Sequence, residues 1–173
     1  MLSENEIEKF NEILRYACIK HEGQVRKSKE AFAIHPIMVA HILLAKGYGS
    51  KHAYTALLHD VLEDTNATQK ELMNLVGDNE IVEVVVALTH KKEQSYEEYT
   101  KQVLKNDLAR TVKCIDILHN LKTADSKGVP RKFTKEFVEK VKANYFPIFQ
   151  GTKFENEILD ELERLKPFAR CAR

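Results

Sequence analysis

Four residues that can bind a metal or transfer a proton lie within six positions near the first third of the chain. They are His59, Asp60, Glu63 and Asp64, and they directly follow the apolar stretch 56–58. On a helix, His59 would share a face with Glu63, and Asp60 with Asp64. Because neighbouring helical residues point about 100° apart, His59 and Asp60 could both reach a metal at a helix end. Burying these groups is costly unless a cation neutralises them, and mixed imidazole and carboxylate ligands suit Mn, Fe or Zn.

Two further segments carry residues of the same chemical types. Asp116 and Asn120 lie four positions apart in the apolar-rich segment 112–120, so they would share one face of a helix. His35 comes just before Pro36, where we expect the first turn of a helix. Each has a simpler explanation when taken alone: His35 as a cap or a surface residue, and Asp116 as half of a salt bridge.

A basic stretch lies upstream of His35 and includes Arg26 and Lys27. Both side chains can bind phosphate, and an arginine can also stack on a base. A solvated turn is the simpler interpretation of such a stretch. The other histidines have no acidic neighbour at chelating spacing, and we expect them to be structural: His21, His41, His52, His90 and His119.

The composition narrows the class of protein. A chain of 173 residues can bury a substantial core, and no repeat or change of composition marks a second domain. We therefore expect a single domain over residues 1–173. Lys and Arg number 27 and Asp and Glu 26, for a net charge of +1, so bulk charge indicates neither a nucleic-acid polymer nor an anionic membrane as partner.

The cysteines and the N-terminus point to a location in the cytoplasm. The three cysteines have no Cys-x-x-Cys spacing, and an odd number cannot pair fully within the chain, so we expect reduced thiols at Cys18, Cys114 and Cys171. The N-terminus has neither the basic nor the apolar segment of a signal peptide, and no apolar stretch is long enough to span a bilayer. We expect a soluble, cytoplasmic protein with no membrane partner.

Apolar residues recur at helical spacing along most of the chain, and three capping boxes mark helix starts: Ser3-x-x-Glu6, Thr68-x-x-Glu71 and Ser95-x-x-Glu98. Besides the helices behind these boxes, we expect helices at 37–46, from a Ser50 cap through His59, at 81–89, 107–123, 134–149 and 155–165. Alternation with a period of two is scarce, which argues against a sheet. The pattern predicts an all-α fold, a compact bundle of about eight or nine helices.

Together these segments resemble the HD-domain superfamily, and within it the hydrolase branch of the RelA/SpoT type and its small single-domain relatives. The resemblance spans roughly residues 13 to 123. It lies in four motifs in the family's order: His21-x-Gly23-Gln24-x-Arg26-Lys27, Ile34-His35-Pro36, Leu57-Leu58-His59-Asp60-Val61-Leu62-Glu63-Asp64-Thr65, and Lys113-x-x-Asp116-x-x-His119-Asn120. Each motif is weak alone, but four in the right order are specific.

The resemblance implies an enzyme that hydrolyses the 3′-diphosphate of guanosine tetra- or pentaphosphate and releases pyrophosphate, with one divalent metal ion, Mn²⁺. Four residues match the family's metal ligands: His35, His59, Asp60 and Asp116. Two match the pair that positions and activates the attacking water: Glu63 and Asp64. Three match contacts to the nucleotide: Arg26, Lys27 and Asn120. Lys113 or Arg110 would offset further phosphate charge.

The sequence departs from the family pattern at several positions. Residues 29–33 replace a Gly-x-Pro-Tyr-Ile turn, and Ile117 stands where an arginine commonly follows the last metal ligand. The segment 95–99 resembles one found in small bacterial relatives. The metal site is therefore matched better than the nucleotide site.

Two alternatives to this activity stay open. The chain could hydrolyse another phosphorylated nucleotide or dinucleotide, or it could be a non-catalytic nucleotide-binding module. The complete set of ligand residues argues against the second, because a degenerate site should have lost some of them. The sequence does not indicate an oligomeric state.

Overall fold

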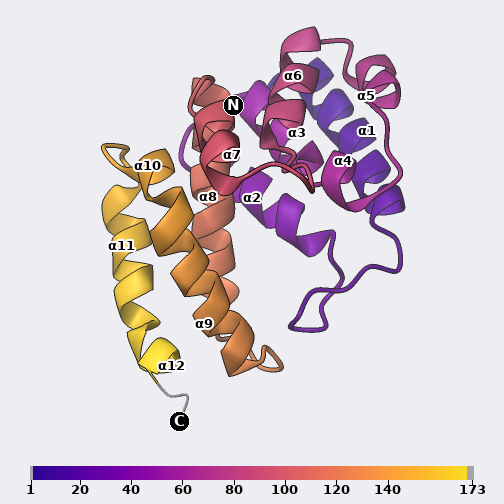
Figure 1. Ribbon diagram of the computed structural model, residues 1–173. Coiled ribbons are helices and arrows are strands. Elements are labelled where there is room, and N and C mark those ends of the chain that lie inside the picture. The colour runs from indigo at the N-terminus through magenta and orange to yellow at the C-terminus, as the bar shows by residue number, and fades with distance from the viewer. Residues whose placement is uncertain (1, 171–173) are drawn as a thin grey trace.

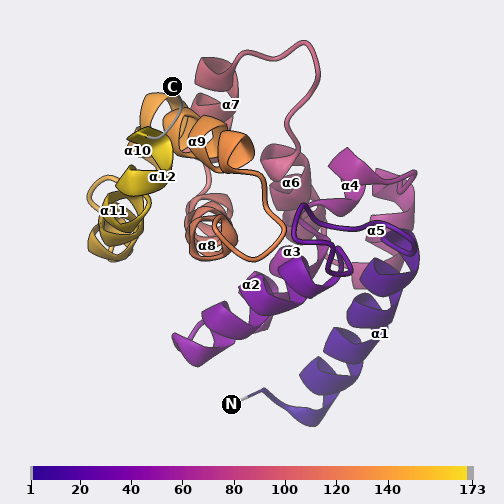
Figure 2. The same ribbon diagram turned by 90° about the horizontal axis from the view of Figure 1, so that it is seen from below.

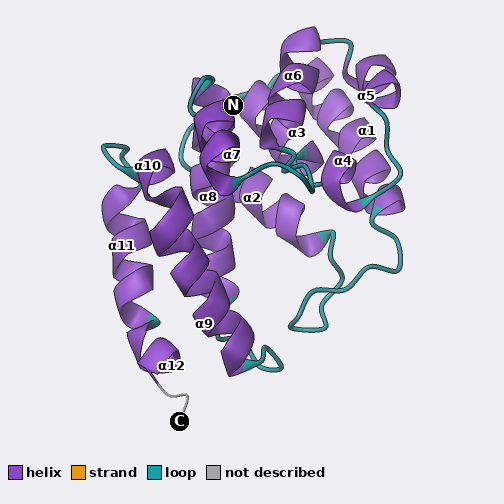
Figure 3. Ribbon diagram, in the orientation of Figure 1, coloured by secondary structure: helices purple, strands orange, loops and turns teal. Residues whose placement is uncertain are grey.

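The computed structural model describes residues 2–170, and all their regular secondary structure is helical (Figures 1 and 3). Cys171 lies outside the described residues. Within them, β-type pairing is limited to one isolated bridge between Val25 and Ala31. The helices are α1 (Glu4–Lys20), α2 (Ile34–Ala45), α3 (Ser50–Leu58), α4 (Val61–Asp64), α5 (Gln69–Val76), α6 (Asn79–Leu88), α7 (Tyr96–Val103), α8 (Asp107–Thr123), α9 (Arg131–Lys140), α10 (Phe146–Phe149), α11 (Glu155–Arg164) and α12 (Lys166–Arg170), with a π-helical turn, η1 (Val141–Tyr145), between α9 and α10.

Nine of the described helices have eight or more residues, which confirms the predicted all-α bundle. Among residues 2–170, every helix is too short or too polar to span a bilayer.

Helix α8 lies at the centre of the molecule. It contacts α2, α3 and α6 on one side and α7, α10 and α11 on the other. In Figure 2 it is seen nearly end-on, between the N-terminal helices and the group α9–α12. Its apolar residues point in several directions, and Val112, Ile115 and Leu118 are all fully buried. The amide of Ala109 bonds to the side chain of Asn106, which caps the helix at its predicted start.

The three predicted capping boxes form as expected. In α1, α5 and α7 the hydroxyl of the cap residue accepts from the third helical amide, and the glutamate at that position accepts from the amide of the cap residue. Each box satisfies two backbone N–H groups that would otherwise lack partners at a helix start. These local bonds explain why the starts of the three helices can be predicted from the sequence.

Helix α2 begins at Ile34, three residues earlier than expected. His35 therefore lies in its first turn and not ahead of it. The turn starts early because the amides of Ile34 and His35 bond to the carbonyls of Ala31 and Phe32, at 3.1 and 2.9 Å. Pro36 is tolerated there because the first helical turn needs no amide donor.

The expected helix from Ser50 through His59 needs two corrections. Its cap is Gly49, because the hydroxyl of Ser50 donates to Oε1 of Glu6 at 2.6 Å instead of capping the helix. The helix ends at Leu58, and α4 begins only at Val61. His59 and Asp60 therefore lie between α3 and α4, and they do not share a helix with Glu63 and Asp64, which belong to α4.

The expected helix 134–149 is also divided. Helix α9 starts at Arg131, and the widened turn η1 separates it from α10. Pro147 lies in the first turn of α10 and has no N–H to donate to the carbonyl four residues earlier. A widened turn is a known way for a helix to accommodate such a missing bond.

Candidate active site

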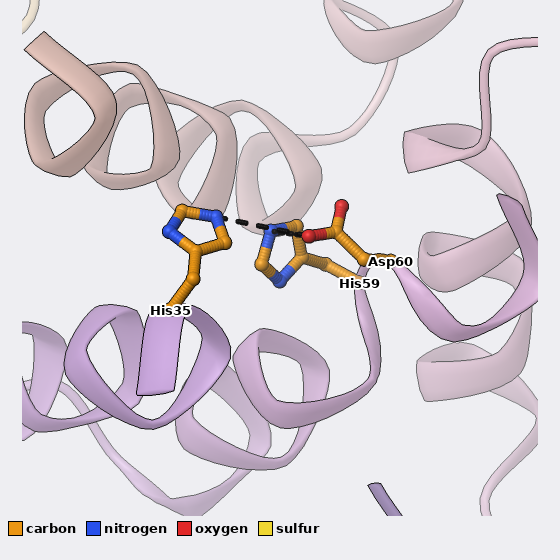
Figure 4. A group of neighbouring side chains, drawn as sticks. All are labelled: His35, His59 and Asp60. Atoms are coloured by element: carbon orange, nitrogen blue, oxygen red, sulfur yellow. Dashed lines mark ion pairs between the residues drawn. The ribbon is translucent and has the colours of Figure 1, made fainter. Parts of the chain in front are cut away.

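The break between α3 and α4 brings His59 and Asp60 opposite His35 of α2. One ligand atom of each residue lies within 4.8 Å of those of the other two. Asp60 Oδ2 is 3.2 Å from His59 Nε2 and 3.7 Å from His35 Nε2. In Figure 4, His35 projects from α2 toward the Asp60 carboxylate, with the His59 ring beside them. These three residues could hold a metal ion.

Asp116 faces the same point from α8. Its Oδ1 lies 2.9 Å from His35 Nε2 and 3.7 Å from His59 Nε2. When several atoms bind one metal ion, each about 2.0 to 2.2 Å from it, they lie about as far from one another as these carboxylate and imidazole atoms do. The structure thus brings together all four residues that the sequence suggests as metal ligands.

The orientation of His59 fits a metal. Its Nδ1 donates to the carbonyl of Ala56 at 2.7 Å, which leaves the lone pair on Nε2. That Nε2 is buried and has no hydrogen-bond partner. Burial alone would lower the pKa of His59, but the carboxylates of Asp60 and Asp116 raise it to about 9. The site therefore favours a positive charge at Nε2, either a proton or a metal ion.

His119 holds the ring of His35. The two Nδ1 atoms are 2.7 Å apart, so one of them carries the shared hydrogen. If His35 directs the lone pair of Nε2 toward a metal, its Nδ1 must donate to His119. Burial, the first of several causes, lowers the pKa of His119 to about 4, so its ring is neutral and can accept. His119, which we expected to be structural, thus contacts a candidate metal ligand; its spacing of three from Asp116 is the signal that could have revealed this.

Asp116 is held by two further side chains. Lys113 Nζ donates to its Oδ2 at 2.8 Å, and Asn120 Nδ2 donates to its Oδ1 at 2.6 Å. Burial would raise the pKa of Asp116, but the charge of Lys113 and the bond from His35 hold it well below its ordinary value. Arg26 donates to Oδ1 of Asn120 at 2.9 Å, so a chain of hydrogen bonds links the basic stretch to the candidate metal site.

A pocket of about 570 Å³ opens beside these residues. Four candidate catalytic or ligand residues line it: His35, Asp60, Asp64 and Asp116. Four cationic side chains line it as well: Arg26, Lys27, Lys113 and Lys140. Its aromatic lining consists of Phe32, Phe133, Phe137 and Tyr145. A pocket with cationic and aromatic walls suits a phosphorylated ligand that carries a flat ring.

The two predicted water-activating acids differ in position. Asp64 lines the pocket, where partial loss of water and the charges of Asp60 and Glu63 raise its pKa to about 6. Both residues are exposed, but Glu63 does not line the pocket; its Oε2 accepts from the amide of His90 at 2.8 Å. Asp64 is therefore placed for contact with a ligand, whereas Glu63 is held at the edge.

Lys113 and Arg110 were both expected to offset phosphate charge, but only Lys113 lines the pocket. Arg110 lies outside it and donates to the carbonyls of Ile148 and Gln150, both at 2.7 Å. Its charge is thus directed at the end of α10, and a role for Arg110 in phosphate binding is not supported.

Comparison with known proteins gives a consistent result. The model of the HD domain family matches residues 14–136. SpoT of Escherichia coli K12, a bifunctional (p)ppGpp synthase/hydrolase, is 34% identical over 135 residues, which are 72% of this chain and 19% of SpoT. A guanosine-3′,5′-bis(diphosphate) 3′-pyrophosphohydrolase of Haemophilus influenzae is 33% identical over 157 residues, 84% of this chain and 22% of that protein. The chain spans about a fifth of the length of these relatives.

A solved structure matches over almost the full length of both chains. It belongs to a metazoan orthologue of SpoT that hydrolyses ppGpp and plays a role in starvation responses. The TM-score is 0.77 and the sequence identity 26%, with 97% of this chain and 98% of the other covered. Since the family model covers most of the chain, including His35, His59, Asp60 and Asp116, the chain belongs to the HD domain family.

Proposed function

We propose that this protein is a metal-dependent phosphohydrolase that removes the 3′-diphosphate of guanosine tetra- or pentaphosphate as pyrophosphate. The observation that carries this proposal is the convergence of His35, His59, Asp60 and Asp116 beside a pocket with cationic and aromatic walls. The activities named for the relatives support the choice of substrate.

We infer that these four residues hold one divalent ion. Imidazole and carboxylate ligands suit Mn, Fe or Zn, and Mn²⁺ is the candidate because the family resemblance implies it. When bound, such an ion lowers the pKa of a water molecule and polarises a phosphoryl oxygen. The buried, unpartnered Nε2 of His59 and the low pKa of Asp116 support a cation at this position.

Asp64 and Glu63 are proposed to orient the attacking water and take its proton. Burial raises the pKa of Asp64 above its ordinary value, which makes this carboxylate a better proton acceptor. Glu63, anchored on the amide of His90, would orient the same water from the edge of the pocket. Attack on the phosphorus next to the ribose breaks its bond to the 3′ oxygen. The products are pyrophosphate and a nucleotide whose 3′ oxygen has taken up a proton.

The remaining pocket residues are proposed to bind the nucleotide. Arg26 and Lys27 can contact phosphate and base, and Asn120 positions Arg26 through the 2.9 Å hydrogen bond. Lys113 already neutralises Asp116, so it would act next to the scissile phosphate.

We also propose that residues 1–173 act as one domain, because α10 and α11 pack on α8, the helix that carries Asp116. A cytoplasmic location is supported by the proposed nucleotide substrate and by the free thiols of Cys18 and Cys114.

The first test is hydrolysis of guanosine tetraphosphate by the purified protein with and without Mn²⁺, followed as pyrophosphate release. Turnover that requires metal and is lost in Asp60→Ala supports the proposal. Glu63→Ala should keep the metal and lose turnover. Bound metal without turnover would instead indicate another phosphorylated substrate, and absence of both would indicate a non-catalytic binding module.

A further inference from the structure

Lys140 is a cation that lines the pocket and takes part in no ion pair among the described residues. It is partly buried, and its Nζ lies 4.7 Å from the ring centroid of Tyr96 and 5.4 Å from that of Tyr145. No carboxylate lies within ion-pair distance of it among residues 2–170; Glu136, which also lines the pocket, is 3.9 Å from Lys132, and Glu139 is 3.9 Å from Lys135. Buried charges in proteins are normally paired, so an unpaired one that faces a pocket indicates a missing anion.

A second lysine on the same aromatic ring strengthens this argument. Lys113 Nζ lies 5.3 Å from the ring centroid of Tyr145, so the ring of this buried tyrosine faces two ammonium groups. Asp116 neutralises Lys113 but not Lys140. Burial would lower the pKa of Lys140, yet Tyr145 and Tyr96 raise it above its ordinary value, so the charge persists.

Helix α9 presents this cation next to an aromatic surface. Phe133, Phe137 and Lys140 follow the i, i+4, i+7 spacing of one helical face, and all three line the pocket. Lys27 lies against Phe133 at the other end, 5.7 Å from its ring centroid. Seven residues of helix separate Phe133 from Lys140, a rise of about 10 Å. The pocket thus has two cationic ends with aromatic rings between them.

We propose that Lys140, held on the rings of Tyr96 and Tyr145, forms a second anion subsite that binds those phosphates of the substrate that are not cleaved. This inference rests on the proposed function, which makes the 5′-diphosphate of guanosine tetraphosphate the group bound there. The aromatic face between the two cationic ends would hold the nucleoside. The subsite therefore favours a nucleotide that is phosphorylated at both the 3′ and the 5′ position over one that is phosphorylated at only one of them.

The test compares substrates that differ only at the 5′ position. Guanosine 3′-diphosphates with a 5′-diphosphate, a 5′-monophosphate or a free 5′-hydroxyl are hydrolysed by the wild type, Lys140→Gln and Lys140→Met. Loss of a charge-assisted contact should raise KM about 10- to 100-fold for the 5′-diphosphate. It should leave KM for the 5′-hydroxyl compound and kcat nearly unchanged, and Lys140→Arg should recover part of the loss.

Lys142→Gln is the matched control. This lysine is exposed, lies two residues further on and does not line the pocket, so the same charge change there should leave every KM unaltered. Thermal unfolding and metal content of each variant show whether the fold and the metal site are intact. Equal KM values for Lys140→Gln and wild type on all three substrates would overturn the subsite, and so would an equal loss on all three.

A binding measurement separates this inference from the proposed reaction. Guanosine diphosphate carries the 5′ group but no 3′-diphosphate, so its affinity can be measured by calorimetry without turnover. If the wild type hydrolyses none of the compounds, the proposed reaction fails. Weaker binding of guanosine diphosphate, but not of guanosine, to Lys140→Gln would still support the subsite, and unchanged binding would refute it.

Discussion

Each candidate imidazole ligand is oriented by a hydrogen bond from its second ring nitrogen. His59 is fixed by the carbonyl of Ala56, and His35 by the ring of His119. Metal-binding histidines generally have such a partner, which fixes the tautomer and the direction of the lone pair. The partner of His35 is the neutral imidazole of His119, whereas metal-binding histidines more commonly bond to a carboxylate or a backbone carbonyl. This hydrogen bond therefore depends on the protonation state of His119.

The contact between His35 and His119 can be tested by two substitutions. His119→Leu removes the acceptor, whereas the Oδ1 of an asparagine can take the place of Nδ1. We expect metal affinity to fall about 10- to 100-fold in His119→Leu and to be largely retained in His119→Asn, as measured by titration calorimetry with Mn²⁺. His52→Leu, which changes a ring that contacts Tyr48, is the control. Equal affinities in the two His119 variants would show that the hydrogen bond does not matter.

Asp116 combines two roles that a double substitution can separate. Asp116→Ala should abolish metal binding and also leave Lys113 buried without its partner, which costs about 3 kcal/mol or more of unfolding free energy. Adding Lys113→Met should restore most of that stability but no metal binding. Denaturant unfolding and metal titration measure the two effects, and metal binding by Asp116→Ala would remove Asp116 from the ligand set.

Among the elements, α8 links the core to the site. Its buried apolar residues pack against helices on both sides, while Lys113, Asp116 and Asn120 occupy the face that borders the pocket. The break between α3 and α4 is equally important, because it lets neighbouring residues His59 and Asp60 direct their ligand atoms to one point.

Arg164 attaches α11 to the end of α8, and a substitution can test how much this contact contributes to stability. Arg164 Nη1 donates to Asp125 Oδ2 at 2.5 Å, and Nη2 donates to the carbonyl of Leu121 at 3.2 Å. Because the two side chains are 42% and 21% exposed, solvent screens the pair. Asp125→Asn should therefore cost about 0.5 to 1 kcal/mol of unfolding free energy at pH 7.

The effect of Asp125→Asn should depend on pH with a definite sign. The bond from Arg164 lowers the pKa of Asp125 below its ordinary value of 3.8. The folded state therefore binds fewer protons than the unfolded state between the two pKa values. The stabilisation is present above the unfolded pKa and is lost as the pH falls through the folded one. Urea unfolding at pH 7 and pH 2.5 checks this, and an undiminished difference at low pH would contradict it.

The candidate metal site joins three separate parts of the chain, which are α2, the break between α3 and α4, and α8. A ligand that binds only this assembled arrangement stabilises the fold by mass action. Metal at about 100 times its dissociation constant contributes about 2.7 kcal/mol. For a protein of this length that is a rise in Tm of about 5 to 10 °C.

Removal of metal should therefore lower Tm by that amount, as measured by thermal unfolding before and after treatment with a chelator. The Asp60→Ala variant, which lacks one ligand, should show the same Tm in both conditions. A wild-type Tm that does not respond to chelation would mean that the four side chains do not hold a metal that stabilises the fold.

The features that the sequence predicts well are those that depend on near neighbours. Capping boxes bond within three residues, and the bounds of α8 match the range 107–123 that the apolar spacing predicts. The four candidate metal ligands could be identified because they stand in short motifs of characteristic residue types. Errors arose where distant contacts compete with local preference, as when Ser50 bonds to Glu6 instead of capping α3.

The helical class and the helix starts marked by capping boxes can be read from the sequence because they depend on contacts within a few residues, and the candidate metal ligands can be named from it because they stand in four family motifs. Only the tertiary structure decided how the site is built. The ring of His35 meets that of His119 across 84 positions of chain. Lys140 reaches Tyr96, a residue of another helix, and Asp64 but not Glu63 lines the pocket. Such contacts depend on how helices pack, and no local pattern of residues specifies them.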